Sequence, residues 1–121
     1  MRPADLELSF RDDAVIARVT GEIDMSNAGE LRDAITDATP SDSLGVVLDL
    51  TAVDYVDSAG IHMLYRLGES LRQRGLALRI VIPPQSAASD ALRLAGIDRH
   101  ADAVEGVDEG VHELAAGPSA G

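Results

Sequence analysis

The residues best suited to chemistry lie in one short segment, Asp57-Ser58-Ala59-Gly60, at the expected start of a helix. Free backbone N–H groups at a helix start carry about half a positive charge. The Ser58 hydroxyl can cap the helix by accepting one of them, or it can accept a phosphate of about −1.5 to −2 charges. Gly60 lets another surface approach closely. Spacing alone leaves both interpretations of Ser58 open.

Acidic side chains are expected around this hydroxyl. We predict that the three acids Asp24, Asp54 and Asp57 have a functional role, whereas most other acids form a solvated surface. A phosphate on Ser58 would be favoured by the helix terminus by ~0.3–2 kcal/mol and opposed by these carboxylates. The attraction of the helix terminus and the repulsion by the carboxylates roughly cancel. We therefore expect a phosphate on Ser58 to leave the fold unchanged and to act mainly on the binding of a partner.

Hydrolytic and metal chemistry are both disfavoured. His62 lies one helical turn after Ser58 and its side chain leans back toward it, but there is no G-x-S-x-G motif, so we expect an exposed or interface histidine. His100 and His112 are isolated, and the chain has no cysteine. We therefore predict no metal site and no cofactor.

Hydrophobic patterning predicts the elements that must position Ser58. The predicted strands are 6–10, 14–19, 46–50, 76–82 and 101–104. The predicted helices are 27–38, 58–73, 86–95 and 107–114. The predicted connections are a polar turn at 11–13, a loop at 21–24 and a turn-like stretch at 51–57.

Several helix ends carry sequence signals. Asn27 and Glu30 have capping-box spacing, and Gly75 is placed to end the helix that starts at Ser58. An opening hairpin followed by alternating strands and helices predicts an α/β fold: a mixed, mostly parallel sheet with about four helices. Sites in such sheets gather at the carboxyl ends of the parallel strands. Met25 and Met63 are expected to pack in the core, although Met63 could line a partner surface.

Composition narrows the class of protein. The chain has 121 residues, 45% of them hydrophobic, and a net charge of −11, which predicts one domain over 1–115 and a disordered tail at 116–121. An acidic chain is a poor ligand for nucleic acid. No stretch approaches the ~20 apolar residues of a membrane span, and the first residues lack a signal peptide. We expect a cytoplasmic protein that binds neither nucleic acid nor membrane.

Two motifs carry a family resemblance. The segment Val46–Leu50 followed by Asp57-Ser58-Ala59-Gly60-Ile61 resembles the signature of STAS-domain anti-sigma factor antagonists. Thr20-Gly21-Glu22-Ile23-Asp24 resembles that family's G-E-[LI]-D loop, at the family's spacing. The resemblance extends over about residues 5–115 and implies the STAS fold. Ala59 departs from the family, which commonly has Ser or Thr there.

The resemblance also implies a function without catalysis. It implies that Ser58 is phosphorylated by a partner anti-sigma factor that is itself a serine kinase, and is restored by a serine phosphatase. The unmodified protein would capture the kinase and free a sigma factor. Asp24, Asp57, Ser58, Gly60 and Ile61 would form the partner-binding surface.

Two alternatives to a kinase-regulated antagonist exist. A response-regulator receiver would place its acceptor at Asp49, but it needs a lysine, and all ten basic residues are arginine. A STAS scaffold or a transporter accessory subunit, acting by constitutive binding, stays open as the second functional hypothesis.

Overall fold

The strands form one sheet in which the order along the chain is also the order in space, β1-β2-β3-β4-β5. The computed structural model describes residues 4–97 and 102–116. The strands are β1 (Asp5–Arg11), β2 (Ala14–Ile23), β3 (Gly45–Val56), β4 (Ala77–Val81) and β5 (Asp102–Val104). The helices in this part of the chain are α1 (Ala28–Ala38), α2 (Ser58–Gln73), α3 (Ala87–Leu94) and α5 (Val107–Ala115).

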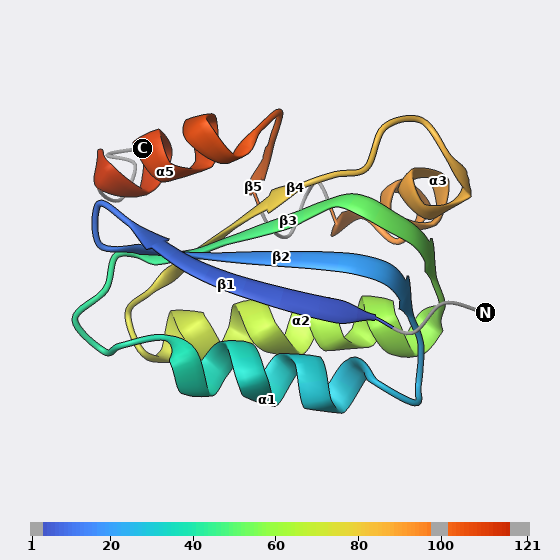
Figure 1. Ribbon diagram of the computed structural model, residues 1–121, viewed down its shortest axis with the longest axis horizontal. Helices are drawn as coiled ribbons and strands as arrows, with labels where there is room; N and C mark the ends of the chain where they lie inside the picture. The colour runs from blue at the N-terminus through green and yellow to red at the C-terminus, as the bar shows by residue number, and fades with distance from the viewer. Residues whose placement is uncertain (1–3, 98–101, 117–121) are drawn as a thin grey trace.

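The sheet is mixed. β1 is antiparallel to β2, and the other neighbours are parallel, so α1, α2 and α3 serve as crossover connections. Figure 1 shows α1 and α2 on one face of the sheet and α5 on the opposite face, with α3 near the end where α2 begins. The predicted α/β fold, with an opening hairpin and about four helices in the described ranges, is confirmed.

The hairpin turn lies where the polar residues predicted it. Asp12 and Asp13 both have positive φ, 52° and 66°, as the central residues of a type I′ turn require. Such a turn matches the twist of the two strands that it joins. It also fixes the register, in which Arg11 pairs with Ala14.

β3 is covered on both faces. Val46, Leu48 and Leu50 belong to the main core, which also includes side chains of α1, α2 and α3. Val47 belongs to a smaller core under α5. Fully burying one such side chain contributes ~1.5–3 kcal/mol to stability. The two cores fix both helical layers to one strand.

Two predicted connections are wrong, because β2 extends to Ile23 and β3 to Val56. The register between these strands shifts twice, and each shift gives β3 one extra residue, as in a β-bulge. Leu50, Val53 and Val56 therefore share the main core although they are spaced by three. This spacing breaks the two-residue alternation on which strand prediction rests. The predicted loop at 21–24 and turn at 51–57 are largely strand.

The helix ends confirm one sequence signal and contradict another. Gly75 has φ +76°, and Leu76 N–H donates to the Leu71 carbonyl at 2.8 Å, so α2 ends in the predicted glycine cap. Asn27 precedes α1, but its side chain makes no capping hydrogen bond. The capping box predicted from Asn27 and Glu30 is therefore wrong.

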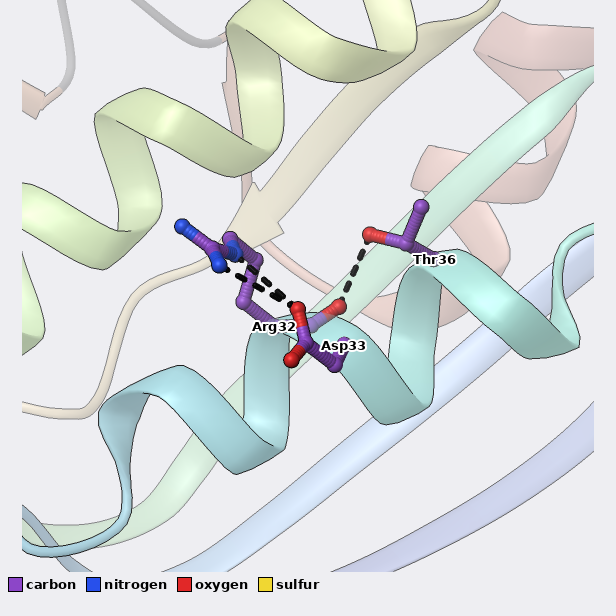
Figure 2. A network of polar contacts seen from close by, with 3 residues as sticks. All are labelled: Arg32, Asp33 and Thr36. Atoms are coloured by element: carbon purple, nitrogen blue, oxygen red, sulfur yellow. Dashed lines mark hydrogen bonds and ion pairs between the residues drawn. The ribbon is translucent and has the colours of Figure 1, made fainter.

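The C-terminal end of α1 is held by Arg74, the C-cap residue of α2. Arg74 donates to the Thr36 carbonyl at 3.3 Å and to the Thr39 carbonyl at 2.5 Å. A cation suits the negative end of a helix, and the last turn of α1 has no basic residue of its own. Figure 2 shows the neighbouring contacts within α1, where Arg32 binds Asp33 and the Thr36 hydroxyl donates to the Arg32 carbonyl.

Three sequence predictions fall at or beyond the limits of the described residues. His100, and Ala101 of the predicted strand 101–104, lie outside them, and so do residues 117–121 of the predicted tail. The other helix predictions are confirmed to within a residue or two. The helix predicted at 86–95 is α3, with Ser86 as its N-cap.

Candidate functional site

The two predicted motifs meet at the carboxyl end of β2 and β3. Ile23 and Val56 are register partners, and Asp57 N–H donates to the Ile23 carbonyl at 3.2 Å. Asp24 and Asp57, which directly follow these two strands, therefore emerge next to each other, and Ser58 comes one residue later as the first residue of α2. Figure 1 shows this end of the sheet, with the start of α2 beneath it.

Ser58 does not cap α2. The N-cap is Asp57, whose carboxylate accepts the Gly60 N–H at 3.0 Å. Ser58 is the first helical residue, it is exposed, and its hydroxyl makes no hydrogen bond within the described part of the chain. The capping interpretation of Ser58 is therefore wrong. The hydroxyl is accessible, and no hydrogen bond within residues 4–97 and 102–116 has to be broken to modify it.

Gly60 is the one predicted partner-binding residue that the structure buries. A Cβ at this position would lie 2.8 Å from Val56 Cγ1 and 2.9 Å from Ile23 Cγ2. The first turn of α2 thus rests directly on the ends of both strands. Gly60 sets the position of Ser58 rather than offering surface itself.

The Asp24 loop is held by its own side chains. Asp24 Oδ1 accepts the Ser26 N–H at 2.9 Å and the Ser26 hydroxyl at 2.5 Å. These bonds, the hydroxyl first and then the backbone N–H, hold the pKa of Asp24 below its ordinary value. Asn27 accepts the Asp24 N–H at 3.1 Å and donates to the Glu22 carbonyl at 2.9 Å. Asn27 therefore fixes this loop instead of capping α1.

Two large apolar side chains next to the acids were not predicted as surface. Met25 is 81% exposed and Tyr55 is 46% exposed. The core placement expected for Met25 is wrong, whereas Met63 is buried as expected. The position of Met25, directly after the G-E-[LI]-D loop, was an available signal. Asp54 is exposed and Ile61 is half-buried.

The geometry does not assemble a hydrolase. His62 is exposed, and its Nε2 accepts the Arg66 Nε–H at 3.2 Å, so that ring nitrogen is directed to Arg66.

Asp49 is buried and accepts the Thr51 N–H at 3.0 Å and the Thr51 hydroxyl at 2.7 Å. It thus secures the first register shift of β3.

Residues 4–97 and 102–116 contain no cluster of His, Asp or Glu suited to hold a metal ion. Within the same ranges, no helix has the length and apolarity needed to span a membrane.

The chain is similar in sequence to known regulators. Residues 5–112 match a family model described as the STAS domain. An anti-sigma-B factor antagonist of Listeria monocytogenes serovar 1/2a is 34% identical over 70 residues, which cover 57% of this chain and 61% of that protein. The chain thus aligns with about three fifths of the length of this curated relative.

The fold is similar to solved structures over nearly the whole chain. A crystal structure of an anti-sigma factor antagonist from Mycobacterium paratuberculosis has a TM-score of 0.77 and 24% identity, and the match covers 93% of this chain and 95% of that one. The Bacillus cell fate determinant SpoIIAA in its phosphorylated form has a TM-score of 0.66 and 15% identity, with 91% and 99% covered. At these identities the likeness concerns the fold.

Proposed function

Because the chain belongs to the STAS domain family, we propose that it is an anti-sigma factor antagonist that works by binding a partner rather than by catalysis. The names of its relatives support this proposal. The partner would be an anti-sigma factor that is also a serine kinase. A serine phosphatase would reverse the modification.

The proposed switch is phosphorylation of Ser58, and one observation carries it. Ser58 is an exposed first residue of α2 whose hydroxyl is not used for capping. A kinase could therefore modify it without breaking a hydrogen bond to any residue that the structure describes. The solved phosphorylated form of a neighbour with this fold is consistent with such chemistry.

The added charge would act on the bound partner. Asp57 caps the same helix end and Asp24 lies beside it, so a partner that docks here should present basic groups to these acids. A phosphate would bring ≈ −1.5 to −2 charges and considerable bulk into that contact. A loss of ~3 kcal/mol in binding corresponds to ~150-fold in affinity.

Met25, Tyr55 and Ile61 would supply the apolar part of the same surface. Interfaces commonly place aromatic residues and methionine at the centre and polar groups at the rim. In this arrangement Asp24 and Asp57 contribute charge, and Gly60 contributes the close seating of α2.

The test is incubation of the purified chain with its anti-sigma factor partner and ATP, followed by mass spectrometry and a binding titration. We expect one phosphate, on Ser58. Ser58→Ala should stay able to bind, and Ser58→Glu should bind ~10-fold or more weakly. Ser41→Glu is the matched control, because Ser41 is an exposed residue of the loop before β3. An unmodified Ser58 without complex formation would favour the STAS scaffold or transporter accessory subunit.

A further inference from the structure

β1 is an edge strand whose outer side has no neighbouring strand in residues 4–97 and 102–116. It is seven residues long, whereas β5 at the other edge has three. Figure 1 shows β1 along the near side of the sheet. A long open edge presents backbone N–H and C=O groups that another strand can bind, and short edge strands limit such pairing.

The hairpin turn determines which backbone groups of β1 face outward. A β-turn joins its first carbonyl to the N–H of its fourth residue, and these are Arg11 and Ala14, which are register partners. Arg11 therefore directs its backbone groups toward β2. Because this direction alternates along an antiparallel strand, Leu6, Leu8 and Phe10 direct theirs toward the open edge.

The same three residues carry apolar side chains on the sheet face that α1 and α2 cover. Leu6 and Leu8 are half-buried against the main core, but Phe10 is 64% exposed. Phe10 borders a surface hollow that contains mainly charged and turn residues. The edge thus combines unpaired backbone groups with one uncovered aromatic ring.

We propose that β1 pairs antiparallel with β1 of a second copy of this chain, about a two-fold axis at Leu8. This register sets Leu6 opposite Phe10 of the second copy, so that each exposed ring gains an apolar neighbour. On the other face it sets Asp5 opposite Arg11 of the second copy. Two-fold symmetry repeats each contact, so the Asp5 end of β1 in each copy lies against the Arg11 end of β1 in the other.

The Leu8 register is favoured over its neighbours. It pairs all seven residues of β1 and joins the outward groups at Leu6, Leu8 and Phe10. Centring the pair on Glu7 would set two glutamates directly opposite, which is destabilising. Centring it on Ser9 would pair only residues 7–11.

Three features oppose association and make the dimer weak. Each copy carries a net charge of −11, and Arg11 already forms an exposed ion pair with Asp108. A single pair of seven-residue strands also buries less area than a standard interface. We therefore expect a dissociation constant of about 0.1 mM, measured at about 0.15 M salt, where charges are screened beyond ~8 Å.

Sedimentation equilibrium over a concentration series tests the charge pairing. Asp5→Arg alone and Arg11→Asp alone should each weaken the dimer by ~10-fold, and the double variant should restore it. Glu105→Arg, after β5 at the opposite edge, makes the same charge change as Asp5→Arg and should not weaken the dimer. A monomer at all concentrations up to about 1 mM, or a double variant no better than the single ones, overturns the proposal.

The register is tested by oxidative cross-linking, because the chain has no cysteine. Leu8→Cys should form a disulfide-linked dimer, since opposed residues in an antiparallel pair lie within the Cα range of a disulfide. Glu7→Cys should cross-link more slowly. Equal or faster linkage of Glu7→Cys would overturn the register. Circular dichroism of each variant checks that it is folded.

Discussion

Gly60→Ala is the sharpest test of how α2 is seated on the sheet. The new Cβ would lie 2.8 Å from Val56 Cγ1, 2.9 Å from Ile23 Cγ2 and 3.2 Å from the Ile23 carbonyl oxygen. Overpacking of this kind costs ~1–3 kcal/mol. Alanine recovers at most ~1 kcal/mol of helix propensity. With the middle of the first range, ~2 kcal/mol, we expect a net loss of ~1–2 kcal/mol in the free energy of unfolding.

Urea unfolding measures this loss, and Gly68→Ala is the matched control. Gly68 lies in the same helix, and its Cβ would meet only Leu78 Cδ2, at 3.6 Å, which is ordinary contact. Gly68→Ala should therefore gain up to ~1 kcal/mol. If Gly60→Ala were as stable as the wild type, the close seating of α2 would be refuted.

Gly60→Ala should also affect binding. The wild-type contact leaves no room for the Cβ, so the first turn of α2 must shift relative to Ile23 and Val56. Ser58 shifts with it, and affinity for the proposed partner should fall even where the variant is fully folded. Unchanged affinity would show that the binding surface does not depend on this seating.

Three further predictions concern the site and the helix ends. Asp57→Ala should lose ~1 kcal/mol of stability with the α2 cap, whereas Ser58→Ala should change it by less than ~0.5 kcal/mol, both measured by urea unfolding. Ser26→Ala should raise the pKa of Asp24 toward its ordinary value of 3.8, as followed by NMR. Because folding lowers the pKa of this carboxyl, its contribution to stability is present above about pH 4 and is lost as the pH falls below it. Arg74→Ala should lose ~1–2 kcal/mol, because it leaves two carbonyls at the end of α1 without their charged donor.

Each of these predictions has a contrary result. Equal stability of Asp57→Ala and wild type would exclude the aspartate cap, and a marked loss in Ser58→Ala would return the cap to the serine. An unchanged Asp24 titration in Ser26→Ala would show that the hydroxyl does not control it. Arg72→Ala serves as control for Arg74→Ala, because the ion pair that Arg72 makes with Glu69 is exposed and contributes little.

Local signals predicted most elements but not the ends of β2 and β3. Turn chemistry at Asp12 and Asp13 and the glycine after α2 are decided by backbone preferences of single residues, so the sequence carries them. The register shifts along β3 depend on which side chains the main core accepts, and Val53 and Val56 enter it out of phase. No periodicity within the strand predicts that.

The candidate site was likewise predicted only in part from the sequence. The family motifs identified Asp24 and Ser58, and strand order placed both at the carboxyl end of the sheet. They did not distinguish Asp57 from Ser58 as the cap, since either side chain can accept a helix N–H. They also did not reveal that Asn27 holds the Asp24 loop, that Gly60 is buried, or that Met25 is exposed.

The sequence alone determined the class of fold, the hairpin, the helix that begins at Ser58 and the acidic character of its surroundings, because each follows from local residue preferences and periodicity. The tertiary structure decided that Asp57 rather than Ser58 caps α2 and that Gly60 packs directly against Ile23 and Val56. Those outcomes depend on the contact between α2 and the ends of two strands that are distant in sequence, and a distance between such segments is set only when the chain packs.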